Sequence, residues 1–133
     1  VSATGLKRTI LYMMSKYLDD SRFRGIAYND LHGEDITKAA DEGDPIAIKA
    51  FDYTARIFGL ALANFTAFTQ PQAFFLTGGL VNSGKWILEP LERYFEDCLL
   101  DVYKGKVQIL MSGLPEKTTA ICGAAALIWE KHR

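Results

Sequence analysis

Residues 74–85 read Phe-Phe-Leu-Thr-Gly-Gly-Leu-Val-Asn-Ser-Gly-Lys, an apolar run that passes directly into two glycines and a short polar loop. The lack of alternation over residues 73–77 is typical of a parallel strand that is buried on both faces. Because glycine has no Cβ, Gly78 and Gly79 allow a ligand to approach the backbone closely. Ligands of open α/β sheets bind at the carboxyl ends of strands, where this pair is expected. The stretch therefore predicts an α/β fold with a ligand site at the end of its first strand.

Helical patterns precede this strand. Apolar residues over 6–18 recur at helical spacing and predict an amphipathic helix, and a short helix is expected at 36–41. Asp44 and Pro45 then mark a helix start, because the aspartate can cap free N–H groups and proline suits the first helical position. This helix should run to about Phe68. Since it carries apolar side chains on more than one side, it should be central and packed on two faces.

A further helix and strand follow the glycine loop. Residues 85–100 are helical in pattern, and Pro90 should kink this element or start a second helix, because proline removes a helix hydrogen bond. Residues 107–111 form the second strand, and a final helix opens at 118 or 119 and runs to about 131. The strand-helix-strand order predicts one right-handed parallel βαβ unit. Two parallel strands make a poor sheet alone, so we expect more strands from residues outside this chain or from a partner chain.

The composition is that of an ordinary globular protein. The chain has 133 residues, enough for one domain with a core, of which 49% are hydrophobic and 23% charged. The net charge is −1 with acids and bases interspersed, which gives no footprint for nucleic acid or for a membrane surface. No apolar run reaches the roughly 18 to 20 residues that span a bilayer, and no signal peptide opens the chain.

Few residue types that carry chemistry stand out. Cys98 and Cys122 belong to no Cys-x-x-Cys pair, so a zinc site within the chain is not expected. Each lies in an apolar stretch, which favours a buried thiol and a reducing, cytoplasmic setting. His32 and His132 are interpreted as surface residues. Because the chain opens on Val1 and not on methionine, we expect it to be a segment of something longer.

The glycine loop has competing interpretations. Residues 79–85 match the spacing Gly-x-x-x-x-Gly-Lys of a phosphate-binding P-loop. The next residue should be a Ser or Thr for magnesium but is Trp86, and the second strand ends in Ser112-Gly113 where a P-loop protein usually has a metal-binding aspartate. These departures disfavour a P-loop. Two interpretations stay open: the adenosine part of a nucleotide lies against Gly78 and Gly79, or the glycines only allow a tight strand-to-helix turn.

Short motifs occur in a defined order over nearly the whole chain. They are Val1-Ser2-Ala3-Thr4-Gly5, Gly43-Asp44 with Ala47, Leu60-Ala61-Leu62-Ala63-Asn64, Gln70-Pro71, Leu76-Thr77-Gly78-Gly79-Leu80, Ser112 and Gly123-Ala124-Ala125. In order and spacing this set resembles the ROK family (repressor, open reading frame, kinase), and it looks like the glucokinase branch of that family.

The resemblance implies an actin-like (ribonuclease H-like) ATPase fold of two α/β domains, with ATP and sugar in the cleft between them. Residues 1–133 would be the helix-rich C-terminal part of the second domain, with the N-terminal domain and the start of the second domain outside this chain. Family members phosphorylate glucose or related hexoses with magnesium-ATP, and many are homo-oligomers. Their Gly-Gly pair lies along the adenosine, which carries over to Gly78 and Gly79, with Thr77 and Leu80 as weaker flanking candidates.

Other motifs of such a kinase have no counterpart in this chain. The phosphate motif Asp-x-Gly-Gly-Thr, the sugar motif Glu-x-Gly-His and the cysteine cluster that holds structural zinc would all precede Val1. Asn29-Asp30 matches the catalytic Asn-Asp only superficially and is interpreted as a solvated turn. We therefore assign no catalytic and no metal-binding residue, and we expect this segment to be inactive alone.

Three functions follow as hypotheses. The first is a fragment of an ATP-dependent hexose kinase that contributes the adenosine side of the cleft. The second is a fragment of a sugar-responsive ROK repressor, the one case in which nucleic acid would be a partner. The third is a stand-alone interaction module that self-associates through an exposed sheet edge and apolar helix faces. The identity of the sugar is not encoded here, because the resemblance places the sugar-contacting residues elsewhere.

Overall fold

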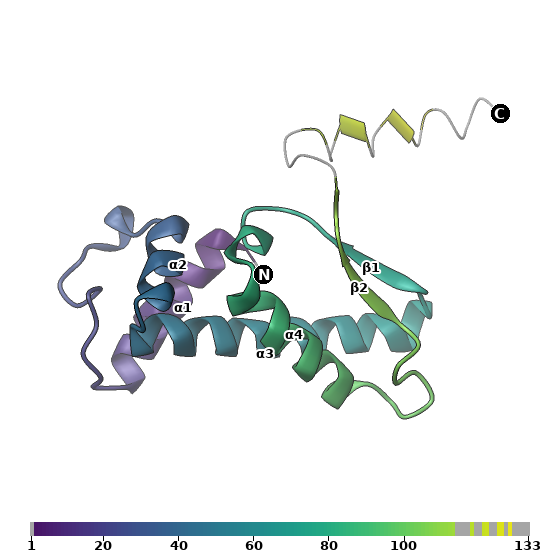
Figure 1. The fold of residues 1–133 in the computed structure, drawn as a ribbon, viewed down its shortest axis with the longest axis horizontal. Helices are drawn as coiled ribbons and strands as arrows, with labels where there is room; N and C mark the ends of the chain where they lie inside the picture. The colour runs from purple at the N-terminus through teal and green to yellow at the C-terminus, as the bar shows by residue number, and fades with distance from the viewer. Residues whose placement is uncertain (1, 114–117, 119–120, 123–124, 127, 129–133) are drawn as a thin grey trace.

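The computed structural model describes residues 2–113 and positions 118, 121, 122, 125, 126 and 128 (Figure 1). The elements in this part of the chain are α1 (Ala3–Lys16), η1 (Tyr28–Asp30), α2 (Gly33–Asp41), α3 (Pro45–Thr69), β1 (Ala73–Leu76), η2 (Val81–Ser83), α4 (Lys85–Cys98) and β2 (Gln108–Met111), where η marks a 3-10 helix. The final helix expected over 118–131 lies largely outside the described residues. None of the described helices combines the length and the hydropathy of a segment that crosses a membrane.

The first two helices begin earlier than their apolar spacing predicted. Helix α1 begins at Ala3 because the Ser2 hydroxyl caps it, accepting a hydrogen bond from the Gly5 N–H at 3.1 Å. Helix α2 begins at Gly33, and the carboxylates of Glu34 and Asp35 lie in its first turn, where the helix dipole favours negative charge. Both starts were missed because they precede the first large apolar residue of the helix and so lie outside the apolar period.

The predicted start of the long helix is confirmed. The Asp44 carboxylate accepts from the N–H groups of Ile46 and Ala47 at 2.9 and 3.1 Å, and Pro45 occupies the first turn. The other carboxylate oxygen of Asp44 accepts from the hydroxyl of Ser21 at 2.9 Å, so the same residue also fixes the irregular segment before α2. Helix α3 packs against α1, α2 and α4, which confirms its central place (Figure 1). The expected packing on two faces is not seen among the described residues, because Ile57 and Leu60 on its other apolar side are 44% and 47% exposed.

Helices α3 and α4 approach each other closely at Gly59. A Cβ built on Gly59 would lie 2.8 Å from the backbone nitrogen of Phe95 and 3.0 Å from the carbonyl carbon of Tyr94. Real Cβ atoms essentially never come this close to backbone atoms, so only glycine fits here. Beside this crossing, Asp52 of α3 accepts hydrogen bonds from the Tyr94 hydroxyl at 2.8 Å and from Arg93 at 3.0 Å. The bond to Asp52, followed by burial, raises the pKa of Tyr94 above its ordinary value.

Helix α4 runs through Pro90 as one element, so of the two expected outcomes, a kink or the start of a second helix, the second does not occur. Proline removes one hydrogen bond in the helix, but apolar packing holds the residues on both sides of it. Ile87 before the proline, and Leu91 and Phe95 after it, are each at most 2% exposed. Their spacing of four residues places them on one face, which packs on α3.

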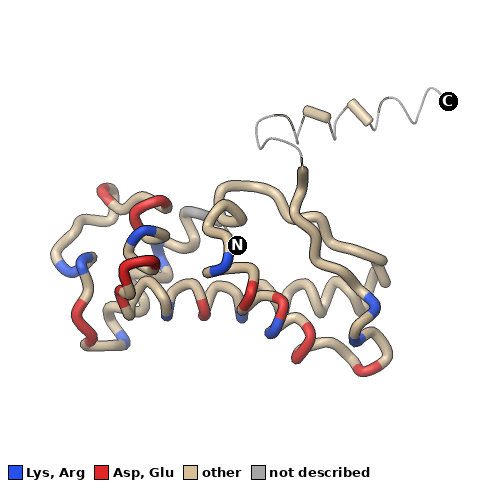
Figure 2. The backbone as a smooth tube through the Cα atoms, viewed as in Figure 1, with Lys and Arg blue, Asp and Glu red and all other residues tan. Residues whose placement is uncertain are grey.

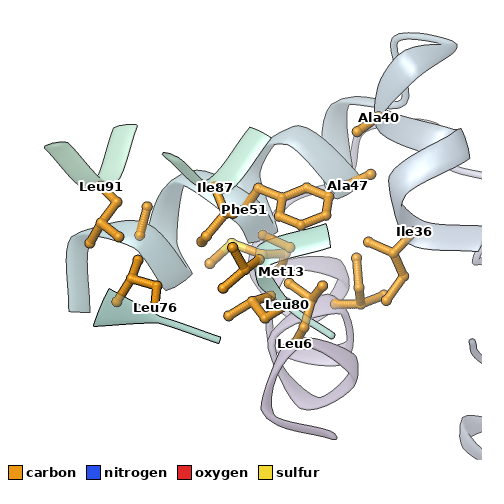
Figure 3. Packing of buried hydrophobic residues seen from close by; sticks show 14 of the residues in the cluster. Leu6, Met13, Ile36, Ala40, Ala47, Phe51, Leu76, Leu80, Ile87 and Leu91 are labelled. Atoms are coloured by element: carbon orange, nitrogen blue, oxygen red, sulfur yellow. The ribbon is translucent and has the colours of Figure 1, made fainter. Parts of the chain in front are cut away.

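One contiguous apolar core joins the helices to the strand end (Figure 3). Leu6 and Met13 of α1, Ile36 of α2 and Phe51 of α3 contribute to it, each at most 3% exposed. Leu76, the last residue of β1, belongs to the same cluster. The end of the first strand is therefore held directly on the helical core.

The two strands pair in parallel, from Ala73 opposite Gln108 to Leu76 opposite Met111, which confirms the predicted pairing. The predicted burial of both faces is wrong for the described residues. Phe74 packs edge-on against Phe95 of α4 with ring centroids 6.0 Å apart, whereas Phe75 is 71% exposed. Side chains alternate along a strand, so one face packs on α4 and the other is not covered by described residues. The apolar composition of the strand did not reveal this difference.

The expected burial of the cysteines is also wrong, because Cys98 and Cys122 are both exposed. Leu99 takes the buried position at the end of α4, and the neighbouring Cys98 points outward as a result. The exposed His32 agrees with its interpretation as a surface residue, while His132 lies outside the described residues. Residues 29–30 are exposed within η1, which confirms the expected solvated turn.

Two side-chain hydrogen bonds fix the glycine loop and the start of α4 to α2. The hydroxyls of Thr37 and Ser83 lie 3.0 Å apart, and the Ser83 side chain is buried. The indole N–H of Trp86 donates to the Asp41 carboxylate at 2.7 Å. Because these bonds join positions about 45 residues apart, they set the distance between α2 and the loop.

Replacing Gly59 by alanine tests the helix crossing. Overpacking costs about 1–3 kcal/mol, and backbone neighbours cannot move aside, so the upper part of this range applies. Alanine regains about 1 kcal/mol of helix propensity, which leaves an expected net loss near 2 kcal/mol. Urea unfolding of Gly59→Ala measures it. Gly5→Ala is the matched control, because its added Cβ meets only the Ser2 hydroxyl at 3.4 Å and should not destabilise. Equal stability of the two variants would contradict the steric argument.

A double-mutant cycle on Thr37 and Ser83 tests the bond between α2 and the loop. Thr37→Val and Ser83→Ala should each lower the free energy of unfolding by about 1 kcal/mol, because each removes the hydrogen bond between the two hydroxyls. The double variant should lose less than the sum of the single variants, since the shared bond is lost only once. Strict additivity of the two losses would show that the hydroxyls do not interact.

Candidate functional site

The glycine pair lies in a turn that directly follows β1. Gly78 has a φ of +104°, a backbone conformation that side chains disfavour. A Cβ built on it meets nothing within 4 Å, so the space in front of this residue is open. Thr77 and Gly79 on either side are exposed. Glycine is thus required at position 78 by the backbone, and the turn leaves its main chain accessible.

Leu80, the fourth candidate from the sequence, has a different position. Its side chain is 9% exposed and belongs to the core cluster, where it lies beside Leu6 (Figure 3). Leu80 therefore anchors the loop in the core while the glycines before it stay exposed. A loop fixed at one point in this way can present its backbone in a defined position.

A cavity of about 720 Å³ lies between this loop and helix α2. Its volume is within the range of about 300–1,000 Å³ that is usual for small-molecule sites. The residues that line it are Leu6, His32, Gly33, Glu34, Thr37, Lys38, Gly79, Leu80, Asn82 and Ser83. Gly79 and Leu80 thus line the cavity, while Thr77 borders a smaller apolar hollow on the other side of the loop.

The two walls of the cavity differ in charge. On the α2 wall, Glu34, Thr37 and Lys38 share one face of the helix, because residues three and four apart are neighbours. The loop wall carries no charge, since residues 69–84 contain no Asp, Glu, Lys or Arg, and the tube in Figure 2 is tan over this stretch. The Thr37–Ser83 hydroxyl pair joins the two walls. The site therefore combines one acid and one base with several neutral hydrogen-bonding groups.

The loop differs from a P-loop in how it uses its backbone N–H groups. In a P-loop, free backbone N–H groups point at the anion. Here the N–H groups of Val81, Ser83 and Gly84 donate within the loop, to the carbonyls of Gly78, Leu80 and Val81 at 3.0, 3.2 and 3.0 Å. The Lys85 ammonium lies 5.0 Å from the ring centre of Trp86. These bonds agree with the earlier argument against a P-loop.

The described residues offer binding groups, but no set of groups for catalysis is apparent. Among them, no three side chains of His, Cys, Asp or Glu are grouped so as to hold a metal ion. The magnesium and zinc implied by the resemblance thus have no ligand set in the described part, and we derive no step through either metal. What the arrangement can do is to bind and orient a small polar molecule between α2 and the glycine loop.

Sequence reasoning found one wall of this cavity and missed the other. Gly78 and Gly79 were identified because a strand that ends in glycines is a local signal. Glu34, Thr37 and Lys38 are spaced as one helix face, but nothing local shows that this face meets a loop more than 40 residues later in the chain. Only the packing of α2 and α4 on α3 brings the two walls together.

Comparison with known proteins agrees with this architecture. Residues 2–131 match the ROK family. Over 99 residues the chain is 29% identical to a glucokinase of Halalkalibacterium halodurans, a match that covers 71% of this chain and 29% of that protein. Over 100 residues it is 28% identical to a glucokinase of Streptomyces coelicolor, covering 75% of this chain and 32% of that protein. The matched region thus spans about a third of the length of these relatives.

Solved structures show the same fold. A ROK family glucokinase from Streptomyces griseus, in complex with glucose and AMPPNP, superposes with a TM-score of 0.76 at 26% identity, covering 96% of this chain and 42% of that one. A ROK family transcriptional regulator, a homologue of the E. coli Mlc protein, superposes with a TM-score of 0.73 at 19% identity, covering 90% of this chain and 29% of that one. The predicted fold class, a helix-rich part of an actin-like ATPase fold with one parallel strand pair, is confirmed. Since the family match extends over residues 2–131, the chain belongs to the ROK family.

Proposed function

We propose that this chain provides the adenosine-binding side of an ATP-dependent hexose kinase of the glucokinase type. The observation that carries the proposal is the open, positive-φ backbone of Gly78 beside a cavity that Gly79 lines. Two comparisons support the proposal. The sequence relatives of this chain are glucokinases, and the similar Streptomyces griseus glucokinase was solved in complex with glucose and AMPPNP. The nucleotide would place its adenosine part against Thr77, Gly78, Gly79 and Leu80.

The proposal includes a division of labour within the kinase. We propose that this chain forms the C-terminal part of the second actin-like domain, and that the catalytic base, the magnesium and the hexose are held by residues outside it. Two observations support this assignment. The chain covers less than half of the length of its relatives, and the apolar face at Phe75 is not covered by described residues. A cytoplasmic location and a homo-oligomeric kinase are part of the same proposal.

A sugar-responsive repressor is the second candidate. It is favoured by the likeness to the ROK transcriptional regulator, which at 19% identity concerns the fold alone. The kinase remains the preferred function because the named sequence relatives are glucokinases. Nucleic acid would be a partner only of the repressor.

Calorimetric titration and a coupled kinase assay test the kinase proposal on the 133-residue chain. Titration with AMPPNP should give saturable binding, because the adenosine side of the cleft is present. Incubation with ATP, magnesium and glucose should give no turnover, since no catalytic base is assigned to these residues. An absence of nucleotide binding would contradict the proposed site, and clear turnover would contradict the proposed division of labour.

A pair of glycine variants separates binding from stability. Gly78→Ala and Gly43→Ala each place a side chain at positive φ, +104° and +86°, and each added Cβ meets nothing within 4 Å. Both should lose about 1–3 kcal/mol of stability through backbone strain. Only Gly78→Ala should also weaken AMPPNP binding when calorimetry is done well below both melting temperatures. Equal effects on binding would place the nucleotide away from the glycine turn.

A further inference from the structure

The cavity between α2 and the glycine loop contains one carboxylate whose role is unassigned. Glu34 lines the cavity and its side chain is exposed. Among the described residues it has no ion-pair partner, whereas Asp41 at the end of the same helix, and Asp44 and Asp52 farther along the chain, are engaged in hydrogen bonds. An unengaged acid in a cavity is available to a ligand.

The chemistry of this acid restricts which part of a nucleotide it can face. A carboxylate only accepts hydrogen bonds, so its partner must be a donor. Phosphate offers no donor at neutral pH and carries negative charge, so in this cavity it could contact Lys38 but not Glu34. The donors of a nucleotide are the hydroxyl and amino groups of its nucleoside part. Glu34 is therefore suited to the nucleoside part of the ligand.

Within a nucleoside, the ribose is the best partner for a carboxylate. Its vicinal 2′- and 3′-hydroxyls are two adjacent donors that match the two oxygens of one carboxylate, the contact by which acidic residues read ribose in dinucleotide-binding sites. The surrounding groups fit a sugar as well. Thr37 lies one turn from Glu34, and its hydroxyl is held at 3.0 Å from that of Ser83.

We propose that Glu34 is a specificity-determining residue that accepts hydrogen bonds from the ribose hydroxyls of the bound nucleotide. This inference rests on the proposed adenosine site and adds to it the group that distinguishes ribonucleotides from deoxyribonucleotides. In this arrangement the base lies toward the glycine turn. The Asn82 amide would contact the edge of the base, and the open backbone of Gly78 would contact its face. The phosphates point out of the cavity, away from Glu34.

Binding of ADP, 2′-deoxyADP and 3′-deoxyADP to the 133-residue chain tests the proposal by calorimetry. The wild-type chain should bind each deoxy analogue about tenfold more weakly than ADP, the effect of one hydrogen bond to a charged group. Glu34→Gln should weaken ADP binding by a similar factor and should bind ADP and 2′-deoxyADP almost equally. Circular dichroism checks that each variant keeps its helical content.

Asp35→Asn is the matched control. Asp35 lies in the same first turn of α2 and bears the same charge near the helix dipole, but it does not line the cavity. This variant should keep both the affinity for ADP and the discrimination against 2′-deoxyADP. If it lost discrimination as Glu34→Gln does, the effect would come from the helix charge and the proposal would be overturned.

Other outcomes distinguish a failure of the role of Glu34 from a failure of the adenosine site. ADP binding without discrimination by the wild type, or unchanged discrimination in Glu34→Gln, would overturn the role of Glu34 and leave the adenosine site in place. The inference would likewise fall if Glu34→Gln instead lost a preference for ADP over purine riboside diphosphate, because the carboxylate would then read the base. A wild-type chain that binds no nucleotide would contradict the proposed function itself.

Discussion

The contact on which the rest of the structure depends is the close crossing of α3 and α4 at Gly59. Without a side chain at this position, the backbone of α4 at Tyr94 and Phe95 comes to rest directly on α3. The crossing orients α4, and α4 in turn carries η2 and the glycine loop at its N-terminal end and leads to β2 at its other end. A shift of α4 would therefore move the loop wall of the cavity relative to α2 and the second strand relative to the first. The absence of a side chain at Gly59 thus determines the positions of both the second strand and the loop wall of the cavity.

The candidate site depends on a loop that is both open and fixed. Leu80 buries its side chain in the core, and the buried hydroxyl of Ser83 meets Thr37 of α2. Between and before these two anchors, Gly78, Gly79 and Asn82 contribute backbone and an amide but little bulk. Internal hydrogen bonds of the turn use the N–H groups of Val81, Ser83 and Gly84 and hold its shape. A loop of this kind suits a flat, largely neutral ligand group, which is the physical basis for the proposal that a nucleoside binds here.

Local signals in the sequence predicted those features whose cause is also local. Asp44 and Pro45 predicted the start of α3, and the apolar strand before Gly78 predicted the position of the turn. The starts of α1 and α2 were missed although their cause is local, because they precede the first large apolar residue of each helix. Other missed features depend on how side chains pack in the assembled fold. The exposure of Phe75 follows from which side of the strand pair α4 covers, and the exposure of Cys98 follows from Leu99 taking the buried position. The α2 wall of the cavity was missed for the same reason, because its partner lies far along the chain.

The register of the strand pair has a consequence for how the chain folds. Ala73 and Gln108 are opposite each other although 35 positions separate them, so their pairing closes a long loop whose entropy must first be overcome. Helix α4 occupies much of that loop, and once it lies on α3 the two strand segments are held near each other. Pairing of the strands should thus be a late event in folding, after the helices have assembled. The same order in reverse would make the small sheet the first part to separate under heat, while the helical core persists.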